Sequence, residues 1–166
     1  MLAIIHAETP EHIEAARELM LEYAQSLGFN LCFQGFDEEL RTLPGKYALP
    51  HGRLLLALWN GQIAGMGALR PLHESGVCEM KRLFVRPGFR GHAIGRTLAL
   101  RLIREAHDLG YLKMRLDTVP GKMDEAIALY RQLGFRTIAP YYASPVEHTL
   151  FMEIELASSS EAQRAV

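Results

Sequence analysis

The chain has 166 residues, a length that fits one domain. Apolar residues make up 49% of it and charged residues 22%, so we expect a globular protein with a sizeable core. The formal net charge of −1 gives no global attraction to nucleic acid or to an anionic membrane, and neither is expected as a partner.

The sequence carries no readable signal for export or for membrane insertion. The N-terminal apolar run 2–7 is too short for a secretory leader and is interrupted by His6. No stretch approaches the about 18 unbroken apolar residues that a membrane-spanning helix needs. We therefore expect a cytoplasmic protein. Its two cysteines, Cys32 and Cys78, are far apart and match no metal-ligand spacing, so neither a disulfide nor a metal is expected.

The first half of the chain has the pattern of a strand, two helices and an antiparallel meander. Thr9-Pro10 is typical of a helix start, and apolar residues recur every three or four positions from Ile13 to Leu27. Asn60-Gly61 is a strong signal for a two-residue hairpin, and Gly65 and Gly67 indicate a bulge or a close approach of two backbones. We expect helices at 10–27 and 37–43, and strands at 2–7, 53–59, 62–72 and 77–85.

The second half alternates strands and helices. Apolar positions at helical spacing run from Ile94 to Leu109, and a second helical pattern covers 124–133. A strand-helix-strand crossover implies parallel pairing with a right-handed connection. Further strands are expected at 113–118, 135–139 and 149–156. The predicted order is β-α-α-β-β-β-α-β-α-β-β, an α/β (mixed α+β) fold forming one domain, 1–156, with a disordered tail, 157–166.

A turn rich in small residues, Arg90 to Gly95, lies between a predicted strand and a predicted helix. A helix start presents unpaired backbone N–H groups and the positive end of the helix dipole. Small residues at Gly91, Ala93 and Gly95 would let a phosphate come close. The Lys and hydroxyl of a nucleotide-binding P-loop are missing, and a dinucleotide fingerprint would need a mostly parallel sheet. The pattern alone predicts either a phosphate site of unknown ligand or a turn that only reverses the chain.

Two segments resemble the motifs of the GNAT N-acetyltransferase superfamily. Residues 77–95, VCEMKRLFVRPGFRGHAIG, resemble the family's strand ending Leu-x-Val-x-Pro followed by Arg/Gln-x-x-Gly-x-Gly/Ala. Residues 126–135, AIALYRQLGF, resemble the family's Ala-x-x-Leu-Tyr-x-x-x-Gly-Phe. The order of elements is similar to that of the family over residues 2–156. The resemblance implies a GNAT-type central mixed sheet, splayed between its fourth and fifth strands.

By this resemblance the chain uses acetyl-CoA as co-substrate and no metal. The pantetheine arm would pair with the backbone of 83–85, and the pyrophosphate would bind the amides of 91–97. Two positions depart from the family pattern: Ala93 replaces the usual middle Gly, and Met123 stands where many members have an Asn that contacts the cofactor. The predicted cofactor-binding residues are Leu83, Phe84, Val85, Arg90, Gly91, His92, Ala93, Ile94, Gly95, Arg96, Thr97 and Tyr130.

Basic residues are frequent around this segment, as the charge of a phosphate would favour. They are Lys81, Arg82, Arg86, Arg90 and Arg96. This clustering is better explained by a phosphate ligand than by nucleic-acid binding.

The resemblance also implies the catalytic residues. Tyr130 occupies the family's Tyr position and is the candidate acid that protonates the leaving thiolate; the alternative is a tyrosine of the core. Glu79 is the candidate base, and the alternative is an ion pair with Lys81 or Arg82. On strict alternation Glu79 shares a strand face with Leu83, unless a bulge intervenes. A backbone N–H near residues 84–85 is the family's usual oxyanion donor. Cys78 lies next to Glu79, but no arrangement of a base and a group that orients it supports an acyl intermediate on Cys78, and a buried, inert thiol is expected.

The acceptor is expected to be a primary amine of a small molecule or peptide, attacked directly in a ternary complex. Candidate substrate residues are Phe33, Asp117, Thr118 and Tyr142. Two aromatic segments, 29–51 and 140–148, are expected to set the specificity. The alternative function is a non-catalytic acyl-CoA-binding sensor or regulatory module, and a nucleotide-binding protein is the third candidate. We also expect dimerisation through an exposed sheet edge.

Overall fold

The computed structural model describes residues 1–28, 30–31 and 35–156. Phe33, one of the candidate substrate residues, and the tail 157–166 lie outside the described residues. The chain divides into two units, which are treated separately below. The first comprises Met1–Arg70 and Met80–Leu102, and the second comprises Pro71–Glu79 and Ile103–Val166. Within the described ranges, no helix has both the length and the apolar character needed to cross a bilayer.

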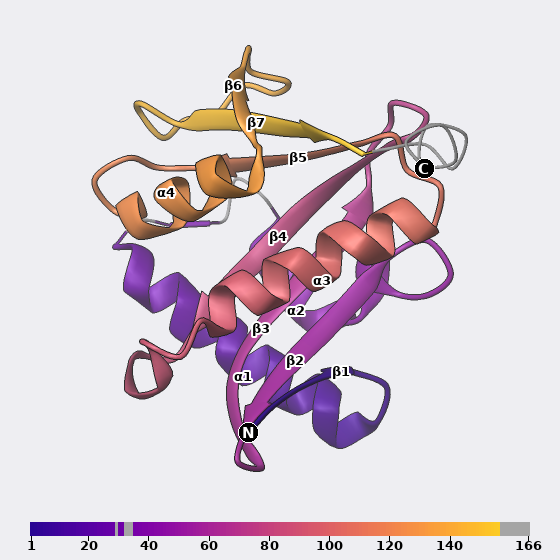
Figure 1. Cartoon of the computed structure of the whole chain (residues 1–166), viewed down its shortest axis with the longest axis vertical. Coiled ribbons are helices and arrows are strands. Elements are labelled where there is room, and N and C mark those ends of the chain that lie inside the picture. Colours follow the sequence, from indigo (N-terminus) through magenta and orange to yellow (C-terminus); the bar gives the residue numbers. More distant parts are fainter. Residues whose placement is uncertain (29, 32–34, 157–166) are drawn as a thin grey trace, which may run out of the picture. The chain divides into compact units, whose positions relative to one another are not determined.

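The elements follow the predicted order, with boundaries that differ by a few residues (Figure 1). One seven-stranded mixed sheet has the strand order β1-β2-β3-β4-β5-β7-β6, which confirms the predicted mixed α/β fold. The elements are β1 (Leu2–His6), α1 (Pro10–Leu27), α2 (Phe36–Thr42), the 3-10 helix η2 (Gly45–Tyr47), β2 (Arg53–Trp59), β3 (Gln62–Pro71), β4 (Val77–Val85), the 3-10 helix η3 (Pro87–Phe89), α3 (Ile94–Asp108), β5 (Lys113–Thr118), α4 (Asp124–Leu133), β6 (Arg136–Ile138) and β7 (Leu150–Glu155).

Helix α1 begins and ends as the sequence predicts. The Thr9 side chain accepts a hydrogen bond from the backbone N–H of His12, and the His12 side chain accepts from the backbone of Thr9. This reciprocal pair satisfies two N–H groups that the first turn of a helix would leave unpaired. At the other end Gly28 has a left-handed backbone, with a φ of 73°, which is the usual way to stop a helix.

The sheet of the first unit is built on the predicted hairpin. Asn60 and Gly61 both have positive φ, at 50° and 82°, as a type I′ turn requires. The pairing of β2 with β3 shifts register between Ala57 and Leu58, so β3 contains the predicted bulge. The consecutive residues 54–57 of β2 are all buried, because α1 and α2 cover one face and the first part of α3 covers the other (Figure 1).

Two glycines of β3 allow close packing in the first unit. A Cβ on Gly65 would lie 2.6 Å from the carbonyl oxygen of Phe84, and a Cβ on Gly67 would lie 2.9 Å from Cδ1 of Leu102. Real Cβ atoms do not approach other atoms this closely. The predicted close backbone approach is therefore confirmed at Gly65, where it brings β3 against the end of β4.

Arg82 is an unusual residue in the middle of β4. It has a left-handed backbone with a φ of 60°, so the strict alternation of side chains along β4 is interrupted there. A bulge was the condition under which Glu79 would not share a strand face with Leu83. Its side chain is buried, donates two hydrogen bonds of 2.9 Å to the Glu39 carboxylate of α2, and lies over the Phe36 ring. Burial opposes ionisation of Glu39, but the hydrogen bonds and charge of Arg82 outweigh it and lower the pKa of Glu39.

The sheet of the second unit combines parallel and antiparallel pairs. Residues Val77–Glu79 of β4 pair in parallel with Lys113–Arg115 of β5, as the crossover pattern predicts. Strand β7 pairs antiparallel with both β5 and β6. This parallel ladder is three pairs long. Buried side chains of this unit include Met114, Leu116, Ile127, Phe135 and Met152.

We predict that Gly65→Ala destabilises the protein by about 1–3 kcal/mol, the usual cost of overpacking a core. The added methyl would meet a backbone oxygen that cannot rotate away. The matched control is Gly88→Ala in η3, where a Cβ would have no atom within 4 Å among its described neighbours. Urea unfolding of both variants checks this, and equal stabilities would contradict the close approach.

We predict that Glu39→Gln is less stable than the parent protein at pH 7, by about 2 kcal/mol for the lost charged hydrogen bonds. Because the pKa of Glu39 is lowered in the folded protein, its contribution is present above the ordinary value of 4.5 and is lost as the pH falls through the folded value. Stability measured from pH 7 to pH 3 should therefore converge for the two proteins. A constant difference would argue that the charge of Glu39 is irrelevant.

Candidate active site

Most of the predicted cofactor residues lie in the turn between β4 and α3 and in the first turn of α3, all within the first unit. After η3 the chain passes through Gly91 and Ala93, whose φ angles are 92° and 57°, and α3 begins at Ile94. A left-handed backbone costs glycine nothing but is strained for alanine. The sequence predicts that Ala93 leaves slightly less room for a pyrophosphate than glycine would. The φ angle adds a second effect, which is backbone strain at Ala93.

The amides of this turn are available to a ligand. Among the residues that the structure describes, none accepts a backbone hydrogen bond from the amides of 91–96. The first such bond is donated by Thr97 to the carbonyl of Ala93, at 3.0 Å. A Cβ added to Gly91 would have no described atom within 4 Å, and one added to Gly95 would meet Val85 Cγ2 first, at 3.7 Å. Such a row of unpaired amides at a helix start suits a phosphate or pyrophosphate.

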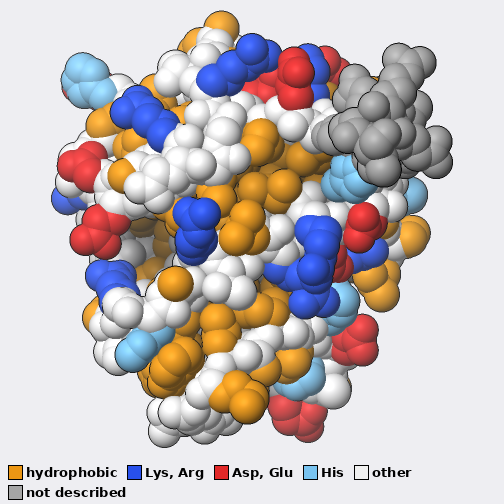
Figure 2. Space-filling view, in the orientation of Figure 1, with side chains coloured by type: hydrophobic (Ala, Val, Ile, Leu, Met, Phe, Trp, Pro, Cys, Tyr) orange, Lys and Arg blue, Asp and Glu red, His pale blue; other side chains and the backbone are white. Residues whose placement is uncertain are grey.

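The basic residues around the turn are less free than the sequence suggested. Arg86 donates three hydrogen bonds to the Glu22 carboxylate of α1, at 2.7–3.1 Å, and one to a backbone carbonyl. Arg82 is held by Glu39. Arg90 is exposed, but its Nε donates to the carbonyl of Val85 at 3.3 Å. Arg82 and Arg86 have carboxylate partners in the protein itself, so their charge is not held in reserve for a phosphate alone. Figure 2 shows acidic and basic side chains interspersed on the face that it draws.

The turn also contains a ring contact. The imidazole of His92 stacks on the indole of Trp59, the last residue of β2, with ring centroids 4.3 Å apart and an interplanar angle of 17°. His92 is among the predicted cofactor residues, whereas Trp59 is not. A residue beside a hairpin turn gives no sequence signal for contact with a turn 33 positions later.

The strand segment predicted to pair with pantetheine lies at the end of β4. Phe84 is buried and its ring meets the edge of Tyr23, with centroids 6.0 Å apart, while Leu83 and Val85 are partly exposed. These three residues follow directly after Arg82. The buried ion pair of Arg82 with Glu39 therefore fixes the position of the backbone where this segment begins.

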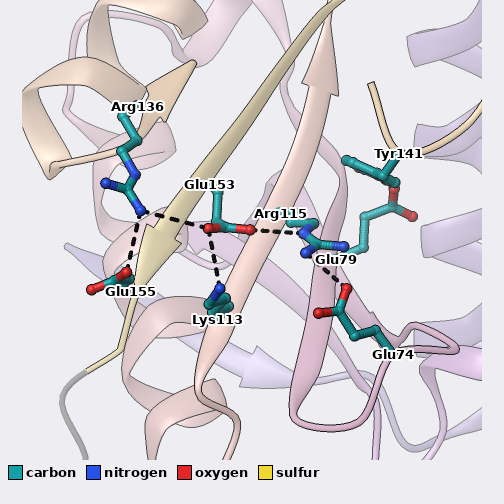
Figure 3. A network of polar contacts seen from close by, with 8 residues as sticks. All are labelled: Glu74, Glu79, Lys113, Arg115, Arg136, Tyr141, Glu153 and Glu155. Atoms are coloured by element: carbon teal, nitrogen blue, oxygen red, sulfur yellow. Dashed lines mark hydrogen bonds and ion pairs between the residues drawn. The ribbon is translucent and has the colours of Figure 1, made fainter. Parts of the chain in front are cut away.

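The second unit carries a row of alternating charges across four strands (Figure 3). In register, Glu79 of β4 lies beside Arg115 of β5, Arg115 beside Glu153 of β7, and Glu153 beside Arg136 of β6. Arg115 binds Glu153 and Glu74, each at 2.8 Å. The hydrogen bond to Glu153 is the largest effect and raises the pKa of Arg115. Arg115 therefore stays charged beside Glu79.

Two tyrosines of the 139–149 loop bind the two candidate carboxylates. Tyr141 donates a hydrogen bond of 2.5 Å to Glu79, which is only 1% exposed, and Tyr142 donates to Asp117. Both rings pack edge-on against Phe151, with centroids 5.1 Å away, and Arg115 lies over the Tyr141 ring. Burial, followed by the charge of Glu79, raises the pKa of Tyr141, so its hydroxyl remains a donor.

Two other candidate residues of the second unit, Thr118 and Tyr130, contact Met123 and Phe135. Adjacent strand residues point to opposite faces, so Thr118 faces away from Asp117, and its hydroxyl donates to the sulfur of Met123 at 3.1 Å. Tyr130 of α4 is 7% exposed, and its ring meets the edge of Phe135.

Cys78 does not have the surroundings of a nucleophile. Its side chain is fully buried. Burial, together with the charge of neighbouring Glu79, raises the pKa of the Cys78 thiol to about 12. The thiol therefore stays protonated at neutral pH.

Comparison with known proteins identifies the family. The model of the acetyltransferase (GNAT) family matches residues 13–135. An uncharacterised N-acetyltransferase of Schizosaccharomyces pombe is 37% identical over 157 residues, which cover 94% of this chain and 96% of that protein. A GNAT-family acetyltransferase of Staphylococcus aureus has a similar structure, with a TM-score of 0.78, 22% identity, and coverage of 95% of this chain and 100% of that one.

A Salmonella typhimurium structure solved with its cofactor acetyl-CoA is also similar, with a TM-score of 0.65, 20% identity and coverage of 94% of each chain. Structural similarity at these identities concerns the fold alone. The family match, by contrast, covers most of the chain, and the relative from Schizosaccharomyces pombe is similar over nearly its whole length. This chain belongs to the GNAT family of acetyltransferases.

Proposed function

We propose that the chain is an acetyl-CoA-dependent N-acetyltransferase that acetylates a primary amine of a small molecule or peptide. The observation that carries this proposal is the turn before α3, where the amides of 91–96 are unpaired within the described protein and Gly91 and Gly95 leave space. In a chain of the GNAT family, acetyl-CoA is the phosphate ligand that fits such a turn. The Salmonella typhimurium protein of the same fold binds acetyl-CoA, which supports this choice.

The first unit would hold the cofactor. The pyrophosphate would bind the amides of 91–97, assisted by Arg90 and Arg96, and the pantetheine arm would pair with the backbone of Leu83–Val85. When bound, acetyl-CoA supplies the acetyl group as a thioester. These residues fit the group because Gly91, His92 and Ala93 are exposed and the amides of 91–96 donate to no other group in the described chain.

Two side chains of the second unit would move the protons. An alkylammonium has a pKa of about 10, so the acceptor must lose a proton before its nitrogen can attack the thioester carbonyl. Glu79, a buried carboxylate, would take that proton directly or through water. As the carbon–sulfur bond breaks, the Tyr130 hydroxyl would protonate the thiolate.

The surroundings of Glu79 and Asp117 support an amine as the acceptor. The two carboxylates lie on the same face of the sheet of the second unit, because Glu79 pairs with Arg115 and Asp117 follows two residues later on β5. Tyr141, Tyr142 and Phe151 present aromatic rings beside them. Carboxylates together with aromatic faces are the groups that attract an ammonium ion.

We predict that the protein releases CoA from acetyl-CoA in the presence of at least one amine of a panel of small primary amines and peptides. Tyr130→Phe should lower kcat on the best amine by about 10²–10⁴-fold, the usual contribution of a general acid. Release of free thiol gives the rate. The matched control is Tyr111→Phe, outside the proposed site, which should keep its activity.

Different results would contradict the role of Tyr130 as the acid and the proposed acetyltransferase activity. Full activity of Tyr130→Phe would show that another group protonates the thiolate. Binding of acetyl-CoA without turnover on any amine would instead favour the non-catalytic sensor.

We predict that Ala93→Gly raises the free energy of unfolding by about 1 kcal/mol, because glycine adopts a left-handed backbone without strain. It should also bind acetyl-CoA more tightly than the parent protein, since removal of the methyl group leaves more room over the turn. Calorimetric titration and urea unfolding measure the two effects.

Ala99→Gly is the control for this strain. Ala99 lies in α3 with ordinary helical backbone, so glycine there should lower stability by about 1 kcal/mol or more. If Ala93→Gly bound acetyl-CoA equally well or less tightly, the effect assigned to the Ala93 methyl group would be wrong.

A further inference from the structure

The contact between Trp59 and His92 joins two parts of the first unit that the function described so far does not connect. Trp59 ends β2, where it pairs with Leu2 and Gln62, and is partly buried. His92 is exposed and belongs to the turn with unpaired amides. The two rings lie nearly parallel, with centroids 4.3 Å apart.

This stack gives a fixed orientation to a side chain that would otherwise rotate. An exposed histidine samples several rotamers, and ordering it costs conformational entropy on binding. A flat contact with an indole restricts the ring and covers one face of it, while the N–H groups lie in the plane of the imidazole and are not used by the stack. His92 can therefore present an N–H donor at the turn without a further ordering cost.

The other side-chain donors of the turn are less well directed. The hydroxyl of Thr97 donates to the carbonyl of Ala93 at 2.8 Å, and Arg90 donates to the carbonyl of Val85. Arg96 is exposed on the first turn of α3. His92 is the donor whose ring is held by a neighbouring ring.

We propose that Trp59 is a positioning residue that holds His92 as a hydrogen-bond donor to a phosphate group of the cofactor. The proposal rests on the proposed function, because it takes the ligand of the turn to be acetyl-CoA or CoA. It adds the end of β2 to the cofactor site and assigns it a role in affinity.

A double-mutant cycle tests the proposal, with the affinity for CoA measured by calorimetry in Trp59→Leu, His92→Ala and the double variant. Each single variant should bind about tenfold more weakly, the factor expected for one hydrogen bond to a charged group. The double variant should bind no more weakly than His92→Ala, because Trp59 acts through His92. Trp59→Phe keeps an aromatic face and should recover most of the affinity lost in Trp59→Leu.

A purely structural role of Trp59 would give another result. Trp59→Leu would then lose the same factor whether His92 is present or absent, and this outcome would overturn the proposal. Dephospho-CoA identifies the phosphate: a loss with both ligands assigns His92 to the pyrophosphate, and a loss with CoA alone assigns it to the 3′-phosphate. Equal affinity of all variants for both ligands would also overturn it.

Fluorescence gives an independent reading, because Trp59 is the one tryptophan of the sequence. If the stack exists in solution, His92→Ala should change the emission of Trp59, and CoA should alter that emission in the parent protein more than in His92→Ala. Unchanged emission in His92→Ala would show that the stack is absent. Failure of the parent protein to bind CoA would reject the proposed function itself, which separates that failure from a failure of this inference.

Discussion

The left-handed backbone at Gly91 and Ala93 is the constraint on which the proposed cofactor site depends. With these two residues in that conformation, the chain leaves η3 and enters α3 so that six successive amides, 91–96, are unpaired within the described protein. The stack of His92 on Trp59 belongs to the same turn, since His92 lies between the two left-handed residues. If the backbone relaxed, the amides and the imidazole would both change direction.

Local patterns in the sequence predicted the elements and the turn well, because capping, hairpin and glycine signals act over a few residues. They carry no information on distant contacts. The basic cluster was attributed to a phosphate, and nothing in the sequence indicated that Arg82 and Arg86 bind Glu39 and Glu22, which are 43 and 64 positions away. No periodicity connects such positions. The strain at Ala93 was also missed, since a motif shows which residue replaces glycine but not the φ angle that it adopts.

In the second unit too, the sequence predicts the strands but not the contacts between residues far apart in the chain. Adjacent residues of a strand lie on opposite faces, yet Asp117 and Thr118 were both chosen as candidate substrate residues. The binding of Glu79 by Tyr141 joins residues 62 positions apart through an irregular loop. The sequence identified that loop only as aromatic. The structure instead pairs each proposed carboxylate with its own phenol, and a protonated amine would have to compete with these hydroxyls for the same oxygens.

The proposed cofactor segment is bounded on both sides by residues other than glycine in left-handed conformation, Arg82 before Leu83 and Ala93 before α3. Each such residue costs about 1–2 kcal/mol, so the surrounding structure has to hold it in place. Arg82 is held by its two hydrogen bonds to Glu39, and the carbonyl of Ala93 accepts bonds from both the amide and the hydroxyl of Thr97. Specific hydrogen bonds thus hold a strained residue in place at each end of the same segment. It indicates that the path of residues 83–92 is specified by the fold before any ligand binds, and a site formed in this way spends little binding energy on ordering the protein.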